Sequence, residues 1–261
     1  RDVRSELRSL LRTSGPHLNE ARDLLAELGV ETAGDKGEEI PAVKSFGEGL
    51  AEAQKRLDEA EADALGMELL RETIEDPSKD AQARAAAATE LETLQETITR
   101  KREAALQLLR NGVRWFGSED DRSQLFEARF RMAFLLLKLE RPWESMVIAD
   151  FLAHTNPKTE SGLRAAAITL ASFSELLNAA GDDKSEVVAL LAPFAEYLIA
   201  TWPQSNEAAT SASALAQLSI VAKQWDKAED YLGMVPAENQ AIGKQRRDLG
   251  ISFYIEYLKE T

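Results

Sequence analysis

The segment from Ala208 to Leu232 constrains the fold of this chain most, because it has the pattern of two short helices joined by a tight turn. Apolar residues recur at helical spacing on both sides of the turn, which lies at Lys223-Gln224. The side chains expected to pack the two helices together are Leu215, Ala216, Trp225 and Ala228. Two helices this short cannot bury their apolar residues alone, so the pattern predicts a stack of neighbouring helix pairs.

An earlier segment has a related pattern, in which the expected packing residues are Ala133, Trp143 and Ala149. Expected helix pairs are followed by three prolines, namely Pro157, Pro203 and Pro236. Proline cannot continue a helix, so each of them marks the end of a pair. The intervals between them are 46 and 33 residues, and the longer interval contains an extra turn at 181–184. The unequal spacing predicts an irregular array.

The composition favours helices throughout the chain. Alanine, leucine and glutamate are abundant, glycine (14 residues) and proline (8 residues) are sparse, and alternating runs of strand type are missing. We therefore expect an all-α fold. In the second half of the chain, three helix pairs and a closing helix are expected at 124–139 and 142–155, 159–180 and 184–201, 205–223 and 225–234, and 238–259.

Two longer segments in the first half each carry an apolar stripe with alternating spacings of four and three residues, which is typical of a coiled-coil seam. The first stripe belongs to a helix expected from Pro41 onward and consists of Phe46, Leu50, Ala53, Leu57, Ala60, Ala64 and Met67. The second, in which Lys101 and Gly112 depart from the apolar pattern, consists of Ala87, Leu91, Leu94, Ile98, Lys101, Ala105, Leu108, Gly112 and Trp115.

A short turn around Pro77 separates the two stripes, which predicts a long antiparallel helical hairpin over residues 41–117. In the alternative, the stripes pair between two copies of the chain and produce a homodimer. The expected domains are short N-terminal helices and a loop over 1–40, the hairpin over 41–117, and the array with its closing helix over 118–261.

Two phrases of the array resemble those of a known family. They are residues 151–157 (Phe-Leu-Ala-His-Thr-Asn-Pro) and residues 197–205 (Tyr-Leu-Ile-Ala-Thr-Trp-Pro-Gln-Ser). Pro203, Ser205 and Ala208 then fit a proline-x-serine-x-x-alanine pattern that opens a repeat. The region 124–235 resembles the tetratricopeptide repeat (TPR) family, whose period is about 34 residues. Within that family it is most similar to repeats of bacterial envelope-associated proteins of the outer-membrane assembly lipoprotein type.

The resemblance implies a short, irregular, right-handed α-solenoid whose inner helices line a concave face that binds a protein or peptide. It also favours an exported or cell-envelope location, with a cytoplasmic location as the alternative. Two positions depart from the family pattern, because Arg141 and Lys223 stand where a glycine usually precedes the aromatic residue of the second helix. The residues with which some relatives hold a peptide carboxylate cannot be aligned here, so that site is not carried over.

The charge balance argues against one class of partner. The chain has 45 acidic and 31 basic residues and a net charge of −14 at pH 7. Nucleic acid is not an expected partner, since a phosphate-binding surface needs Lys and Arg to replace counterions.

The longest apolar run, at 134–137, is too short to cross a bilayer, so no transmembrane segment is expected. The lack of cysteine excludes disulfides and cysteine-based zinc sites.

No catalytic, metal-binding or cofactor-binding residue is expected. The chain lacks the nucleophile-elbow, P-loop and dinucleotide-binding glycine patterns. Neither His17 nor His154 has a second histidine at a metal-ligand spacing, and His154 is expected to interact with a helix C-terminus. The acidic clusters at 119–121 and 182–183 precede expected helices, which predicts a capping role. An enzyme with an unrecognised carboxylate pair is the most distant alternative.

The aromatic residues divide into an expected core and an expected binding surface. Trp143 and Trp225 are expected between the helices of their pairs. The rings of Phe126, Phe130 and Phe134, spaced four residues apart, are also expected in the core. The residues expected to contact a partner are Trp115, Phe116, Tyr254 and Tyr257.

The sequence thus predicts a non-enzymatic scaffold that binds a peptide or helix on its concave face. A structural subunit that self-associates through the hairpin is the alternative.

Overall fold

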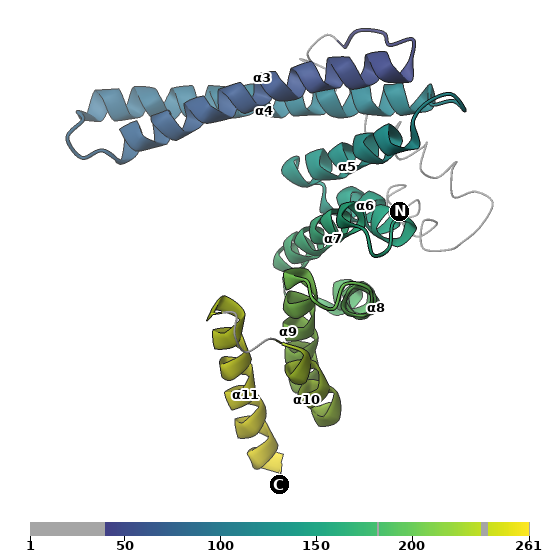
Figure 1. The fold of residues 1–261 in the computed structure, drawn as a ribbon. Helices are drawn as coiled ribbons and strands as arrows, with labels where there is room; N and C mark the ends of the chain where they lie inside the picture. Colours follow the sequence, from purple (N-terminus) through teal and green to yellow (C-terminus); the bar gives the residue numbers. More distant parts are fainter. Residues whose placement is uncertain (1–39, 182, 236–239, 261) are drawn as a thin grey trace, which may run out of the picture. The chain divides into compact units, whose positions relative to one another are not determined.

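A computed structural model describes residues 40–181, 183–235 and 240–260, and the regular structure in these ranges is helical, without strands (Figure 1). For these residues the predicted all-α class is confirmed. The short helices and loop expected before residue 40 lie outside the described ranges. The helices are α3 (Phe46–Glu75), α4 (Ala81–Arg114), α5 (Arg122–Lys138), α6 (Pro142–Thr155), α7 (Glu160–Ala179), α8 (Ser185–Thr201), α9 (Asn206–Val221), α10 (Trp225–Met234) and α11 (Gln240–Glu260).

The helix ends lie within about two residues of the expected ones, with one exception. The helix expected from Pro41 begins at Phe46, because a polar cap forms just before that residue. The Ser45 hydroxyl accepts a hydrogen bond from the Glu48 amide at 3.1 Å, and the Glu48 carboxylate accepts one from the Lys44 amide at 2.7 Å. These bonds satisfy amides that a helix start leaves unpaired, so they fix where α3 begins.

Aspartates cap later helices, as the acidic clusters predict. Asp121 and Asp183 each accept a hydrogen bond from the amide of a serine two residues later, at 2.8 and 3.2 Å. Asp80 accepts one from the Ala83 amide at 2.7 Å, just before α4. The serine hydroxyl and amide donors lower the pKa of Asp121 and of Asp183, because they stabilise the carboxylate form. The predicted capping role is confirmed for Asp121, which is the N-cap of α5, whereas Asp183 lies one residue before the N-cap Lys184 and binds the first amide of α8.

The described chain divides into two units, and the first is mainly residues 52–108. In this unit α3 and α4 lie side by side and are joined by a short turn (Figure 1). The Lys101 ammonium forms an ion pair with Asp63 at 2.7 Å, between the two helices. Gly66 faces Leu94 so closely that an added Cβ would sit 3.3 Å from a methyl carbon of that leucine. The space between α3 and α4 is therefore narrow.

The side chains buried in this first unit are mostly small. Six residues of the two predicted stripes have at most 5 % of their surface exposed, namely Ala53, Ala60, Ala87, Ile98, Ala105 and Leu108. The departure at Lys101 has a physical reason, since its side chain is only 19 % exposed and its charge is neutralised by Asp63. A single chain thus buries these parts of both stripes.

The second unit contains residues 43–51 and the described part of 109–261, so it includes the start of α3 and the end of α4. Phe46 and Phe116 meet edge to face, with ring centroids 5.2 Å apart. Gly112 lies against Gly49, because a Cβ at Gly112 would sit 3.1 Å from the Gly49 Cα. This close approach of two backbones explains why glycine interrupts the second stripe. The domain borders predicted at residues 40 and 117 stay predictions.

Helices α5 to α11 pack in order within the second unit (Figure 1). α5 contacts α6, α7 contacts α8, and α9 contacts α10, while α6 with α7 and α8 with α9 link one pair to the next. The first helices of the pairs also contact one another, α5 with α7 and α7 with α9. α11 packs on α9 and α10. The helices α5, α7 and α9 therefore form a continuous row.

The main core of this row of pairs combines aliphatic side chains with a few large aromatic rings. Phe173, Phe194 and Trp202 are buried. The Phe194 ring lies 6.0 Å from that of Phe173 and 6.3 Å from that of Tyr197, measured between centroids. The Trp202 indole N–H donates a hydrogen bond to the Thr159 carbonyl at 3.2 Å. This bond ties the end of α8 to the residue that caps α7.

The predicted packing residues of the repeats lie at two depths. Five of them are at most 4 % exposed, namely Ala133, Ala149, Leu215, Ala216 and Ala228. The two tryptophans are half-buried. Trp143 packs on the main core, whereas Trp225 meets Phe253 and Tyr257 of α11 edge to face, at 5.7 and 6.3 Å. Trp225 thus joins its own helix pair to the closing helix.

The turns within the first and third pairs have the same backbone. Glu140 and Lys223 each adopt a left-handed conformation, with φ of 57° and 58°. In each turn the amide of the next residue donates to the carbonyl five residues earlier, at 2.8 Å. The backbone therefore makes Glu140 equivalent to Lys223. The sequence alone suggests a different match, because Arg141 and Lys223 each lie two residues before a tryptophan. Because glycine favours left-handed backbone, the glycine-like position of the first turn is Glu140 and not Arg141.

Candidate functional site

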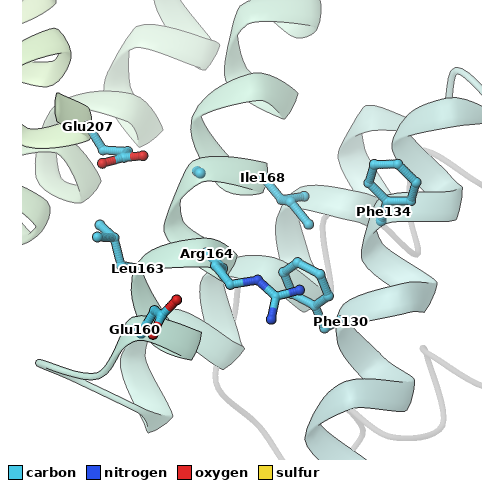
Figure 2. A pocket seen from close by; sticks show the side chains of 8 residues that line it. Phe130, Phe134, Glu160, Leu163, Arg164, Ile168 and Glu207 are labelled. Carbon is cyan, nitrogen blue, oxygen red and sulfur yellow. The ribbon is translucent and has the colours of Figure 1, made fainter. Parts of the chain in front are cut away.

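Helices α5, α7 and α9 form an open groove with a volume of about 620 Å³ (Figure 2). All three helices contribute to its lining, which consists of Phe130 and Phe134 from α5, Glu160, Leu163, Arg164, Ala167 and Ile168 from α7, and Glu207 from α9. Most of these side chains are apolar and the other three are charged. An apolar surface with a few charged groups is suited to a ligand that presents bulky side chains in a fixed orientation.

The geometry of α5 leaves Phe134 at the surface. Its neighbours Ala133, Leu135 and Leu136 are at most 1 % exposed and fill the positions that face other helices, whereas Phe134 is 43 % exposed. The prediction that Phe134 belongs to the core is wrong. Each step of four residues turns about 40° past a full helical turn, so the third phenylalanine of the series has rotated away from the core.

Arg164 extends from α7 over the face of Phe130 (Figure 2). Its guanidinium carbon lies 4.4 Å from the ring centroid, which is a cation–π contact between α7 and α5. Glu160 precedes Arg164 by four residues, a spacing at which oppositely charged side chains often pair on a helix. Within the described part of the chain, however, Arg164 forms no ion pair within 4.0 Å. An aromatic ring, and not a carboxylate, therefore holds the guanidinium in the groove.

The charged groups are separated along the groove (Figure 2). Glu160 and Glu207 lie on one side, Phe130 and Phe134 lie on the other, and Arg164 lies between them. Arg164 and Glu160 are exposed, and Glu207 is partly exposed. The lining thus contains one cation, Arg164, beside Phe130 and two anions at its far side, and the ammonium of Lys138, which is not part of the lining, lies 5.5 Å from the Phe134 ring.

The residues predicted to contact a partner are not among those that line this groove. Trp115 follows α4 and is 57 % exposed, while the adjacent Phe116 is partly covered by Phe46. Tyr254 and Tyr257 lie on α11 and are 61 % and 42 % exposed. Their role in binding stays a prediction.

α11 carries a second exposed apolar surface. Four residues at helical spacing are about half exposed or more, namely Ile251, Tyr254, Ile255 and Leu258. Other positions of the same helix pack inward, since Leu249 is 6 % exposed and Phe253 packs beside it on the cluster of α9 and α10. The predicted partner residue Tyr254 lies at the centre of this exposed stripe.

His154 is the titratable group with the most distinctive surroundings. Its ring stacks on Tyr197 with centroids 3.9 Å apart, and its Nδ1 lies 3.0 Å from the carbonyl oxygen of Asp150. This contact in the last turn of α6 agrees with the predicted interaction at a helix C-terminus. Burial raises the pKa of the Asp150 carboxyl, and the nearby His154 partly opposes that shift. The described residues bring no three His, Cys, Asp or Glu side chains together at metal-binding distance.

Among the described helices, none combines the length and the apolar composition needed to cross a lipid bilayer. No family model, no curated protein and no solved structure matches this chain. The resemblance to the TPR family therefore rests on the sequence phrases and spacings given above, and it stays a prediction.

Sequence reasoning missed the charged residues of the groove, which are Glu160, Arg164 and Glu207. One signal for Arg164 was available, because Phe130 and Arg164 are 34 residues apart and so are Phe134 and Ile168. That interval is the TPR period. Aligning the first two pairs on it places Phe130 and Arg164 at equivalent positions of their first helices. Their contact joins the first helices of two neighbouring helix pairs, α5 and α7.

Proposed function

We propose that this protein is a non-enzymatic scaffold that binds a peptide or a helix in the groove of α5, α7 and α9. In this proposal the helix pairs form a short, irregular, right-handed α-solenoid of TPR type, preceded by a helical hairpin of α3 and α4. The contacts of α5 with α7 and of α7 with α9 support the solenoid. A continuous row of first helices presents one surface to an elongated ligand.

The observation that carries the proposal is the exposure of aromatic surface in the groove. Phe134 is 43 % exposed, and Phe130 and Leu163 beside it are partly exposed. Covering apolar surface contributes about 25 cal/mol per Å² removed from water, so a ligand that packs on these rings gains affinity. Aromatic and arginine side chains are the residues that most often anchor such contacts.

Two phenylalanines of the first helix pair form a matched test. Phe134 on α5 lines the groove and is 43 % exposed, whereas Phe151 on α6 does not line it and is 46 % exposed. Each ring has one cation nearby, Lys138 for Phe134 and Arg129 for Phe151, at 5.5 and 5.6 Å. The substitutions Phe134→Asp and Phe151→Asp therefore remove similar surface contacts from two different faces.

We expect affinity capture from an extract of the source cell, read by mass spectrometry, to separate the two variants. The amount of each polypeptide retained by the wild-type chain should fall about tenfold with Phe134→Asp and should be unchanged with Phe151→Asp. Circular dichroism of both variants checks that they are folded. If the wild-type chain retains no polypeptide that Phe134→Asp loses, or if it turns over a small molecule, the proposal is wrong.

Self-association through the stripes of α3 and α4 has less support as a function. Ala53, Ala60 and Ala105 of these stripes are at most 2 % exposed within one chain, which leaves them unavailable to a second copy. Light scattering measures the mass in solution directly. A mass of two chains that falls to one chain when exposed α3 residues such as Leu65 are replaced would favour self-association.

A further inference from the structure

We propose that the groove selects polypeptide segments in which one Asp or Glu side chain is flanked by bulky apolar side chains, and that Arg164 binds this carboxylate. The inference rests on the proposed binding function of the groove and adds the chemistry of the ligand. The apolar side chains of the segment cover Phe134 and Leu163, and its carboxylate approaches the guanidinium beside Phe130.

The placement of Arg164 suits a carboxylate. The Phe130 ring covers one face of the planar guanidinium, with 4.4 Å between the guanidinium carbon and the ring centroid. The N–H groups point outward in the plane of the guanidinium, where this ring does not cover them. Two of these N–H groups match the two oxygens of a carboxylate. The stacking contact also limits the rotamers of Arg164 before the ligand arrives, so less side-chain entropy is lost on binding.

The local charges explain why the acid has to come from the ligand. Glu160 is spaced to neutralise Arg164, yet Arg164 forms no ion pair within the described part of the chain. The chain carries a net charge of −14, so most of its surface repels an acidic segment. Arg164 supplies the cation of the groove lining, whereas Lys138 lies outside the lining beside Phe134, so a carboxylate inside the groove is placed best at Arg164.

The opposite side of the groove limits how acidic the ligand can be. Glu160 and Glu207 lie beyond Arg164 as seen from the aromatic rings, and they repel a second carboxylate that approaches that side. An isolated acidic residue between apolar residues is therefore complementary to the groove, whereas a run of acidic residues is not.

Phage display of random peptides tests the inference. Each peptide is fused through its C-terminus to the coat protein, so side chains supply the only carboxylates that can be selected. The library is panned on the wild-type chain, on Arg164→Ala and on Arg164→Glu. Arg122→Glu is the control for net charge, because Arg122 is exposed at the start of α5 and does not line the groove.

We expect the wild-type and Arg122→Glu pools to be enriched in Asp or Glu next to Leu, Ile or Phe. The Arg164→Ala pool should keep the apolar residues and lose the acidic one, and the Arg164→Glu pool should gain Lys or Arg in its place. A selected peptide, synthesised with an amidated C-terminus, should bind Arg164→Ala about tenfold more weakly than wild type. Replacing the acidic residue of the peptide by the corresponding amide should weaken its binding to the wild-type chain by a similar factor. The same replacement should not change its binding to Arg164→Ala.

Phe130→Leu keeps an apolar side chain in the groove and removes the stacking contact with Arg164. It should therefore weaken the binding of the same peptide by a smaller factor than Arg164→Ala does. Pools without acidic residues on the wild-type chain, or acidic enrichment that survives in Arg164→Ala, would overturn the inference and leave peptide binding by the groove intact. Failure of the wild-type chain to enrich any peptide over an uncoated surface would overturn both proposals.

Discussion

The α3–α4 interface and the array of α5 to α10 are both made of helices, but they bury different side chains. In the first unit most of the buried residues of α3 and α4 are alanines, such as Ala53 and Ala105. The core of the array contains the rings of Phe173, Phe194 and Trp202. In the first unit α3 and α4 therefore meet along a narrow seam with many small residues, whereas the core of the array combines aliphatic side chains with large rings.

The difference shows how much surface each kind of packing leaves for a ligand. A two-helix seam holds one stripe of each helix. In the array, α7 contacts α5, α6, α8 and α9, and its residues Leu163, Arg164 and Ala167 still face the groove. A helix that is held from several sides can present ordered side chains, which is what a binding surface requires.

The largest difference in stability between the two regions is expected when a glycine is replaced by alanine once in α7 and once in α3. A Cβ at Gly162, in the first turn of α7, would overlap the carbonyl oxygen of Asn156 and sit 3.1 Å from a ring carbon of Trp202. The backbone has to move, so Gly162→Ala should lower the free energy of unfolding by about 3 kcal/mol. A Cβ at Gly66 meets only a flexible methyl of Leu94. Gly66→Ala should therefore stabilise the chain by less than about 1 kcal/mol through helix propensity.

Urea unfolding with two probes separates these effects. All four tryptophans lie in the second unit, so their fluorescence reports on that unit, whereas circular dichroism reports on every helix. The fluorescence midpoint should fall for Gly162→Ala and stay unchanged for Gly66→Ala. Equal shifts for the two variants would show that α7 is packed no more tightly than α3.

An effect of middle size is expected for the ion pair between α3 and α4. The side chains of Lys101 and Asp63 are 19 % and 25 % exposed. Asp63→Ala leaves the ammonium partly buried without its partner, which should cost about 1 kcal/mol. Adding Lys101→Met, which continues the apolar stripe, should recover that loss. Unfolding of the four members of this double-mutant cycle, followed by circular dichroism, gives the coupling energy. A coupling of zero would contradict the expectation.

The smallest effect is expected for a pH-dependent contact in the array. The Tyr231 hydroxyl on α10 donates a hydrogen bond to the Glu196 carboxylate on α8 at 2.8 Å. Burial, and then the Glu196 carboxylate, raise the pKa of Tyr231 from 10.0 to about 12. The folded state thus favours the protonated phenol. Its contribution to stability is complete below pH 10 and is lost as the pH rises from 10 to 12.

The stability difference between wild type and Tyr231→Phe should therefore shrink over that pH range. Urea midpoints from tryptophan fluorescence, measured below pH 10 and near pH 12, give this difference. Tyr254→Phe, which changes an exposed ring on α11, is the matched control and should show no such trend. A Tyr231→Phe difference that is the same at both pH values would exclude a role for this hydrogen bond.

Local signals in the sequence predicted most of the helical structure. Where a helix begins depends on residues close together in the chain, and Asp121 caps α5 as expected, while Asp183 binds the first amide of α8 from one residue before its N-cap. Ala133 and Ala149 are fully buried, because small residues at helical spacing occupy the points where helices approach most closely. The start of α3 was misplaced because Pro41 is also a helix-start signal, and the cap at Ser45 acts instead.

The groove could be predicted only in part, because it depends on contacts between distant residues. Periodicity marks Phe134 as one of a series of phenylalanines, but which members of the series are covered depends on how the neighbouring helices pack. The contact of Arg164 with Phe130 joins two helices, and no feature near either residue indicates it. The correspondence of Glu140 with Lys223 likewise became visible only from the backbone, since the tryptophans that follow them are offset by one residue.

Three chain reversals in the array are made by residues with side chains in a conformation that glycine adopts more easily, namely Glu140, Lys158 and Lys223. Each such residue costs roughly 1–2 kcal/mol relative to ordinary helical backbone, and the surrounding helices impose the bend nonetheless. The bends at these corners therefore form without glycine. A sequence pattern that requires glycine at a corner would pass over all three of them.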